Sequence, residues 1–208
     1  MAVSDERHLV DEIAMAIVST ELPAGTHLTA AGLAERLDVS RTPIRESLRE
    51  LEALGLVELL GRRGAFVVDP ADIDATAMRD LVETRRLVEP HVLGQAAERS
   101  TGADHRRSEA ALADGDRAMA RGDGGRLNIA HHRLLTSMVA GSHNDAAIRA
   151  LRPLHFRTCL VVARTAAITL PEGWKVHRRV AEAIERGDGA TAAALHSDHL
   201  GEVLESLV

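Results

Sequence analysis

Residues 34–49, which read AERLDVSRTPIRESLR, decide how the first part of the chain folds. Ser40 is a favourable residue to cap a helix, and Pro43 falls in the first turn after it, where the missing N–H of proline is tolerated. One side of this helix is apolar and consists of Ile44, Leu48, Leu51 and Leu54. Another side carries cations four residues apart, which therefore share one face: Arg41, Arg45 and Arg49.

The neighbouring segments complete a small domain around this helix. Apolar residues at helical spacing predict a helix over about 5–20, and Thr29 is placed to cap a short helix that carries Leu33, Ala34 and Leu37. After the third helix, short apolar runs at 56–60 and 65–68 predict a β-hairpin. Three helices and a hairpin make a winged helix-turn-helix, which we expect to occupy residues 1–69.

The rest of the chain, residues 70–208, is predicted to be entirely helical. Glycine and proline divide it into about six helices, over 72–100, 103–121, 124–140, 144–168, 172–186 and 188–207. The expected fold class is therefore mainly α, with an N-terminal winged helix-turn-helix followed by an all-α bundle of about six helices.

The composition excludes several classes of protein. The 208 residues are 45% apolar and 27% charged, as in globular proteins, and no apolar run is long enough to span a membrane. The single cysteine, Cys159, has no partner for an internal disulfide, and residues 1–10 lack the apolar region of a signal peptide. We therefore expect a cytoplasmic protein.

The arginine face of the third helix has the chemistry of a DNA reader, although the net charge of −6 argues weakly against one. The planar guanidinium of arginine binds guanine edges or phosphate, and a helix N-terminus with hydroxyl side chains donates to phosphate oxygens. Arg62 and Arg63, between two glycines, would bring two cations to the tip of the hairpin. The alternative is a solvated helix face on which arginines pair with glutamates such as Glu46.

At these residues the sequence resembles the GntR family of bacterial transcription regulators. The segments that match are 22–28, 33–48, 51–57 and 61–67. The resemblance implies operator contacts from Ser40, Arg41, Thr42, Arg45, Arg49 and the wing glycine Gly64. Ala31 stands where relatives often carry an arginine that touches DNA, so that contact is expected to be missing.

In the second half, a few of the eleven histidines have a spacing that suits a metal site. Asn128 and His132 are four residues apart on one helix, so both side chains can point to one place. His177 and His199 lie 22 residues apart on two helices joined by a short turn. Three imidazoles and one oxygen suit a divalent ion, Zn or Ni first.

Residues 72–207 are similar to the helical C-terminal domain of the FadR subfamily, the FCD domain, and six helices fit its VanR-like branch. The similar pieces are 83–90, 128–132 and 177–200. The resemblance implies that the domain binds an effector and dimerises, that the metal ligands are Asn128, His132, His177 and His199, and that Arg85 faces the ligand cavity. His131 departs from the pattern because an aromatic residue usually precedes the ligand histidine, and Asn128 brings no charge to the site.

Together these observations predict a transcriptional repressor that binds a near-palindromic operator as a homodimer. The predicted effector is a small carboxylate, held by the metal and by Arg85 or Arg86. The helices at 72–100 and 144–168 are the predicted dimer interface. Two alternatives keep the DNA-binding function: a purely structural metal, or a metal-free pocket for an acyl or other organic ligand. A metal-dependent hydrolase is a remote alternative, because no His-Glu-x-x-His motif and no nucleophile elbow are present, so we expect no enzyme.

Overall fold

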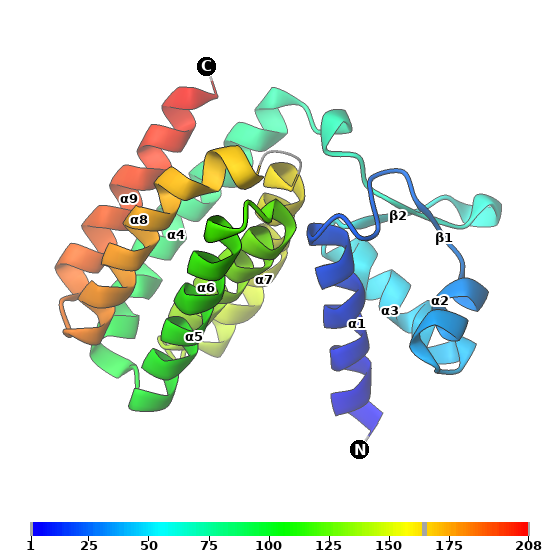
Figure 1. Cartoon of the computed structure of the whole chain (residues 1–208), viewed down its shortest axis with the longest axis horizontal. Helices are drawn as coiled ribbons and strands as arrows, with labels where there is room; N and C mark the ends of the chain where they lie inside the picture. The colour runs from blue at the N-terminus through cyan, green and yellow to red at the C-terminus, as the bar shows by residue number, and fades with distance from the viewer. Residues whose placement is uncertain (1, 164–165, 208) are drawn as a thin grey trace.

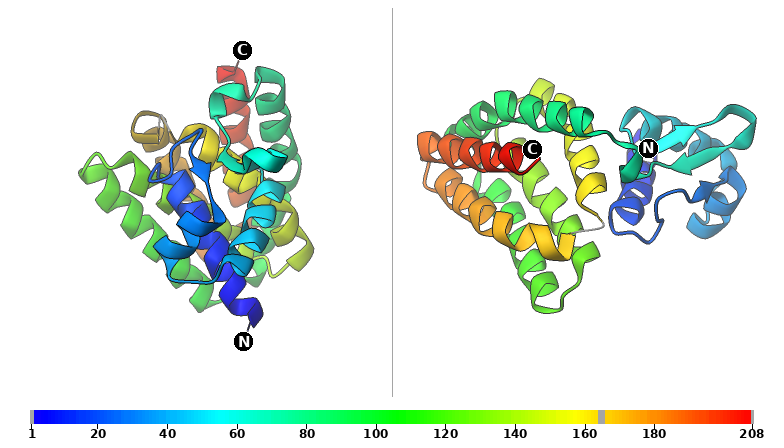
Figure 2. Two further views of the ribbon diagram at one scale, coloured as in Figure 1. Left: turned by 90° about the vertical axis from the view of Figure 1, so that its right-hand side faces the viewer. Right: turned by 90° about the horizontal axis from the view of Figure 1, so that it is seen from above.

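The protein has two lobes, an N-terminal one with a small sheet and a C-terminal bundle of helices (Figure 1). The computed structural model describes residues 2–163 and 166–207; within these ranges, the side chains of 2–7, 62, 167 and 168 are not described. Seen from above, the bundle and the small lobe lie side by side, and the chain passes from one to the other ahead of α4 (Figure 2).

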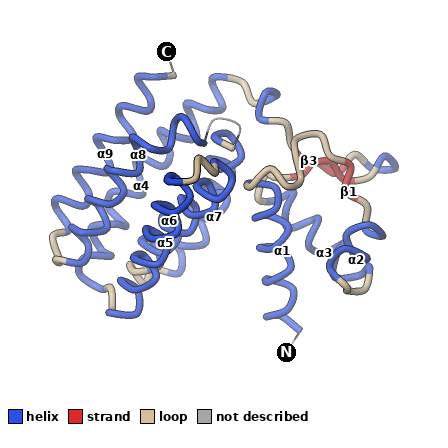
Figure 3. Tube along the Cα trace, viewed as in Figure 1, coloured by secondary structure: helices blue, strands red, loops and turns tan. Residues whose placement is uncertain are grey.

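The N-terminal lobe is a winged helix-turn-helix, as predicted. Its helices are α1 (Ala2–Val18), α2 (Ala30–Leu37) and α3 (Arg41–Ala53). Its strands are β1 (His27–Leu28), β2 (Val57–Leu59) and β3 (Ala65–Val67), and a 3-10 turn at Gly61–Arg63 separates the last two. They form an antiparallel sheet in the order β1-β3-β2, drawn in red in Figure 3. The sequence did not predict β1, because two residues are too few to show an alternating pattern.

The bundle has six helices, as predicted, with one boundary in a different place. They are α4 (Ala75–Arg99), α5 (Gly102–Ala120), α6 (Gly124–Ala140), α7 (Asp145–Val162), α8 (Ala166–Glu185) and α9 (Gly189–Ser206). The predicted break before residue 172 is wrong, because α8 already begins at Ala166 and includes Pro171. That proline lies close to the start of the helix, where it interrupts few backbone hydrogen bonds.

Polar caps fix where the helices begin. Thr29, Asp74, Thr101, Asp123, Asn144 and Asp188 each accept a hydrogen bond from a backbone N–H in the first turn of the helix that follows. Each such cap stabilises its helix by about 1 kcal/mol. None of the helices in the described part of the chain is long and apolar enough to cross a membrane.

The two lobes share hydrophobic packing. The core of the N-terminal lobe contains residues from α1, α2, α3 and the sheet, and it also contains Phe156, Cys159 and Leu160 from α7. A second core, built mainly from leucine, alanine and valine, lies inside the bundle around Trp174. Because α7 contributes three buried residues to the core of the first lobe, and Ile129 of α6 packs against the same core, the N-terminal lobe is docked on these two helices.

Candidate DNA-binding face and buried polar site

The start of α3 presents an exposed polar face. Its members are all exposed: Ser40, Arg41, Thr42, Arg45 and Arg49. Ser40 occupies the N-cap but makes no side-chain capping hydrogen bond, so its hydroxyl is not committed to the helix. Among the described residues, no carboxylate forms an ion pair with the three arginines, and Glu50 pairs with Arg152 instead. The face therefore lacks the arginine–glutamate pairs of the solvated alternative.

The wing carries an exposed arginine and a glycine that its geometry requires. Arg63 is exposed, whereas the side chain of Arg62 lies outside the described residues. Gly64 has a φ of 96°, which L-residues rarely adopt, and a Cβ built on it would lie 2.5 Å from Nε2 of His27. His27 is stacked on Phe66, with ring centroids 4.7 Å apart, so it cannot move aside without losing that contact.

A buried ionic cluster lies in the middle of the bundle, with the Glu89 carboxylate at its centre. Arg85 donates to both oxygens, from Nε at 2.7 Å and from Nη2 at 3.0 Å. His155 from α7 lies 3.0 Å from one oxygen, and His196 from α9 lies 2.5 Å from the other. Arg85 also donates from Nη1 to the hydroxyl of Thr158 at 3.1 Å. The cluster thus ties three helices together through one carboxylate.

The charges in this cluster are set by the groups around it. Burial alone would raise the pKa of Glu89, but the positive charge of Arg85 and the contacts with His155 and His196 hold it well below its usual value. Burial, reinforced by neighbouring cationic groups, keeps the pKa of His131 well below its usual value. Burial likewise lowers the pKa of His199 to about 4. His131 and His199 are therefore neutral imidazoles beside a charged arginine–glutamate pair.

The structure brings two of the predicted metal ligands together. His177 and His199 have ring centroids 4.9 Å apart, and His196 lies 6.0 Å from His177. The third imidazole beside His177 is His131, at 5.0 Å. His132 instead stacks on Phe156, with centroids 4.2 Å apart. Neighbouring residues on a helix diverge by about 100°, so α6 directs only one of its two adjacent histidines toward α8.

Asn128, the fourth predicted ligand, is engaged with the backbone of the two lobes. Its Nδ2 donates to the carbonyl of Val18 at 2.9 Å and to that of Cys159 at 2.8 Å. Its Oδ1 is buried without a hydrogen-bond partner, and so are the Nδ1 atoms of His132 and His177. Among the described residues, no three His, Cys, Asp or Glu side chains are arranged to hold a metal ion. The predicted ligands therefore offer free donor atoms without converging on one point.

The two arginines predicted as effector anchors have different positions. The guanidinium of Arg85 is buried, and its hydrogen bonds go to Glu89 and Thr158. Arg86 is exposed, and its guanidinium lies over Gly201 of α9, 3.3 Å from where a Cβ would be. An incoming carboxylate would therefore compete with Glu89 for Arg85.

Sequence reasoning missed four members of the buried site: Glu89, His131, His155 and His196. One signal for Glu89 was available, because an arginine and a glutamate four residues apart lie on the same face of a helix. His196 lies three residues before His199 on the same side of α9, which is a similar signal. His155 had none, because its partner is 66 residues away in the sequence.

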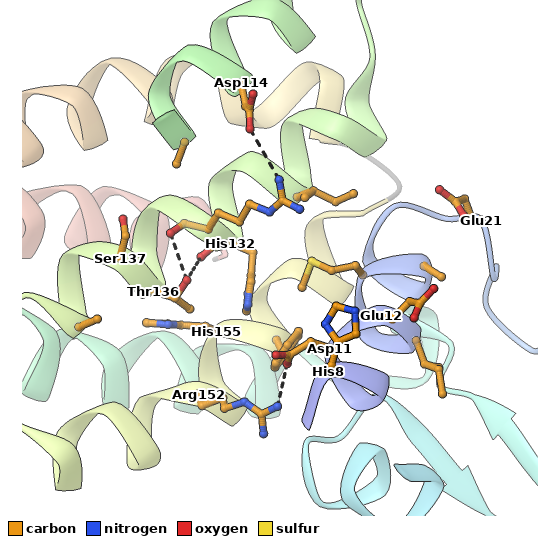
Figure 4. A pocket seen from close by; sticks show the side chains of 18 of the residues that line it. His8, Asp11, Glu12, Glu21, Asp114, His132, Thr136, Ser137, Arg152 and His155 are labelled. Carbon is orange, nitrogen blue, oxygen red and sulfur yellow. Dashed lines mark hydrogen bonds and ion pairs between the residues drawn. The ribbon is translucent and has the colours of Figure 1, made fainter. Parts of the chain in front are cut away.

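A cleft of about 1070 Å³ separates α1 and α2 from α5, α6 and α7. His132 and His155 reach its inner wall (Figure 4). Two acidic groups at its rim are paired, Asp11 with Arg152 and Asp114 with Arg133. The lining is a mixture of apolar and polar side chains, and both lobes contribute to it.

Two family profiles match the chain. The family described as bacterial regulatory proteins, gntR family, matches residues 6–67, and the FCD domain matches residues 80–202. The two matched ranges fall on either side of the loop between β3 and α4, and together they cover both lobes.

Relatives with known roles match over nearly their whole length. The galactonate operon transcriptional repressor of Escherichia coli K12 is 29% identical over 217 residues, covering 94% of each chain. The transcriptional regulator LutR of Bacillus subtilis is 28% identical over 212 residues, covering 92% of this chain and 95% of LutR. The solved structure of Escherichia coli McbR/YncC has a TM-score of 0.79 at 16% identity, covering 97% of this chain and 96% of that one. This last likeness concerns the fold alone.

Proposed function

Because this chain belongs to the GntR family of bacterial regulatory proteins and carries an FCD domain, we propose that it is a repressor released from its operator by a small carboxylate. The coarser function follows from the family: the protein is a DNA-binding transcriptional regulator and not an enzyme. The galactonate operon repressor, whose name contains that of a sugar acid, supports both the repressor role and the effector class.

One observation carries the DNA-binding mode: the exposed arginines of α3 have no ion-pair partner among the described residues. We infer that Arg41, Arg45 and Arg49 contact the major groove, with Ser40 and Thr42 donating to phosphate at the start of the helix. The wing, with Arg63 and Gly64, would follow the adjacent backbone or groove, and Arg62 belongs to the same proposal. Arginine can bind a guanine edge with two hydrogen bonds, which gives sequence preference.

The second part of the proposal places the effector in the bundle, beside the buried histidines. Asn128, His132, His177 and His199 would hold a divalent ion, Zn or Ni first, once the side chains of Asn128 and His132 turn from Val18, Cys159 and Phe156 toward the other two histidines. The unpartnered atoms of the first three support this assignment. The ion would supply positive charge that attracts a carboxylate. The neutral imidazoles around His177 have the protonation state that ligation requires.

A metal-free pocket is the second candidate, and the ionic cluster favours it. Glu89 already satisfies Arg85 with a carboxylate of the chain itself, so Arg85 needs no bound anion to balance its charge. The imidazoles of His177 and His199 would then hydrogen-bond an organic ligand directly. The third candidate is a structural metal, which would stabilise the bundle of the same regulator without taking part in effector binding.

We propose a homodimer, because one winged helix makes few base contacts and operator binding by two is much stronger. The exposed face of α4 supports this: Leu87 is 82% exposed and Val88 is 37% exposed in the middle of a bundle helix. Two adjacent exposed apolar residues, on the side of α4 that faces away from the bundle core, favour a protein interface. We place α4 in the dimer interface, and α7 beside it.

The first experiment tests DNA binding. Duplexes are selected from a random pool by the wild-type protein, and their affinity is compared for wild type, Arg45→Ala and Arg106→Ala. The Arg45→Ala change should weaken binding by about 10- to 100-fold, the value of one bidentate base contact. Arg106 is exposed on α5, outside the proposed dimer interface, and serves as the matched control with little effect. Equal affinity of all three proteins would refute the assigned face.

The second experiment tests the metal. Elemental analysis compares purified wild type with the His177→Ala, His199→Ala double variant, and chelation is followed by both the melting temperature and carboxylate affinity. An ion that takes part in sensing changes both quantities on chelation, whereas a structural ion changes only the first. A wild type that stays metal-free after exposure to Zn²⁺ and Ni²⁺ leaves the metal-free pocket as the function of the cluster.

A further inference from the structure

The helix α7 has two faces that belong to different parts of the molecule. One face carries Phe156 and Leu160, which are buried in the core of the N-terminal lobe. The other carries His155 and Thr158, which contact Glu89 and Arg85 in the bundle. A shift of α7 that accompanies a change in the buried cluster therefore moves the surface on which the DNA-reading lobe rests.

Arg152, one turn before Phe156, forms a direct ionic link between the lobes. Its Nη1 donates to Oε1 of Glu50 on α3 at 2.7 Å, and its Nη2 donates to Oδ1 of Asp11 on α1 at 2.9 Å. The guanidinium carbon lies over the ring of Phe156, 5.5 Å from its centroid, in a cation–π contact. Within the described residues, both ion pairs that join the lobes start at this one side chain.

The contact with Glu50 fixes the helix that carries the arginine face. Glu50 follows Arg49 directly, so its side chain points about 100° away from that of Arg49. The core of the N-terminal lobe already holds α3 through Ile44, Leu48 and Leu51. The contact of Glu50 with Arg152 ties this packed lobe to α7, so that Arg41, Arg45 and Arg49 keep one direction relative to α7. The contact with Asp11 links α1, on which α3 packs, to the same helix α7.

We propose that Arg152 is a positioning residue for DNA recognition, which holds the recognition helix α3 in a fixed orientation on the bundle through Glu50 and Asp11. The proposal rests on the proposed function in one respect, because it needs two α3 helices to engage one operator. Two heads that already have the right orientation bind the second half-site with a high effective concentration, whereas two loosely held heads do not.

This proposal separates two effects on DNA binding. Arg152 touches no part of the assigned DNA face, so its loss should leave the affinity of one winged helix for one half-site nearly unchanged. The affinity for a full operator, which depends on the relative orientation of two heads, should fall. A residue with a merely structural role would lower both affinities together or neither.

The test uses the full-length chain and two probes, a full operator duplex selected by wild type and a duplex that contains one half-site. Arg152→Gln keeps much of the aliphatic stem but removes the fork, and Arg106→Gln removes the same charge from an exposed position of α5 as a control. We expect Arg152→Gln to lose about five- to tenfold in full-operator affinity and less than twofold on the half-site. Arg106→Gln should match wild type on both.

Two further variants keep the result interpretable. Glu50→Gln breaks one of the two links from the other side and should reproduce part of the loss seen for Arg152→Gln, with no additional loss when both changes are combined, since partners in one contact are not additive. Arg152→Lys keeps the positive charge but loses the planar fork that donates to the two carboxylates from separate nitrogens, so it should recover only part of the affinity. Should Arg152→Gln fail to fold, Glu50→Gln provides the same comparison.

The proposal is overturned when the full-site and half-site affinities change by the same factor, when neither changes, or when full-operator affinity rises. The wild-type protein checks the proposed function independently. A wild type that binds the full operator no better than the half-site contradicts the dimeric reading, whereas a clear preference that Arg152→Gln preserves contradicts only the role of Arg152.

Discussion

At the scale of single residues, Glu89 is the group on which the interior of the bundle depends. A buried carboxylate is tolerated only when cations and hydrogen-bond donors surround it, and here Arg85, His155 and His196 supply them. Because each partner is itself buried, the loss of one leaves the others without compensation. Removing a single member of the ionic cluster should therefore lower the stability of the folded protein strongly.

We expect Glu89→Gln to lower the free energy of unfolding by about 3 kcal/mol or more, because Arg85 would then be a buried charge without a counter-ion. The double variant Arg85→Met, Glu89→Leu removes both charges and should be less destabilised than Glu89→Gln alone. Urea unfolding at fixed protein concentration measures both. A single variant as stable as wild type would mean that the pair adds nothing to stability.

At the scale of elements, the wing depends on its glycine. Gly64 has a positive φ, and the space where a Cβ would stand is taken by His27. Gly61, at the other end of the same turn, also has a positive φ, but nothing lies within 4 Å of its virtual Cβ. The two glycines therefore differ in crowding, and Gly64, with φ 96° and ψ −159°, also lies in a backbone region that is essentially restricted to glycine.

We expect Gly64→Ala to destabilise the protein by about 1–3 kcal/mol and to weaken operator binding, because the wing has to distort. Gly61→Ala is the matched control and should cost about 1 kcal/mol, from its backbone alone. Removing the obstructing ring, as in the His27→Ala, Gly64→Ala double variant, should recover part of the DNA affinity. Thermal unfolding and duplex titration give the two readouts, and equal effects of the two glycine variants would argue against crowding.

Elements that depend on local chemistry could be predicted from the sequence. The cap at Thr29, the apolar stripe of α3 and the two short strands of the wing lie close to their predicted places. The start of α8 could not, because Pro171 looks like a boundary but falls within the first turns of a longer helix. Local patterns specify where a helix is favoured, and packing decides where it begins.

The buried site shows the same limit more strongly. The spacing of His177 and His199 indicated that two helices would bring their rings together, and the structure places them 4.9 Å apart. The rotation of α6, which selects His131 over His132 as the neighbour of His177, depends on how that helix packs against α7 and α8. A rotation of one residue is invisible to periodicity, because both histidines fall on the buried side.

At the scale of the whole molecule, the buried histidines make stability depend on pH. Burial lowers the pKa of His132 to about 3 and the pKa of His199 to about 4. In the unfolded chain both titrate near their usual value of about 6.5. The unfolded state therefore takes up protons first, and stability present above that pH is lost as the pH falls toward 4.

We expect the chelator-treated protein to lose up to about 1.4 kcal/mol per pH unit for each such histidine between about pH 6.5 and 4. His132→Phe keeps a ring against Phe156 and removes one titrating group, so its stability should fall less steeply over the same window. Chemical denaturation at several pH values provides the measurement. Identical slopes for the variant and wild type would show that His132 is not held neutral by the fold.

The hydrophobic core that α7 shares with the N-terminal lobe bears on how regulators of this architecture diversify. Recombination at the loop between β3 and α4 would exchange the reader for another, but Phe156, Cys159 and Leu160 would stay behind and meet a foreign surface. A new reader would then dock poorly, however well it recognised its own operator. We therefore expect the N-terminal lobe and the face of α7 that packs against it to change together in evolution, although they are far apart in the sequence.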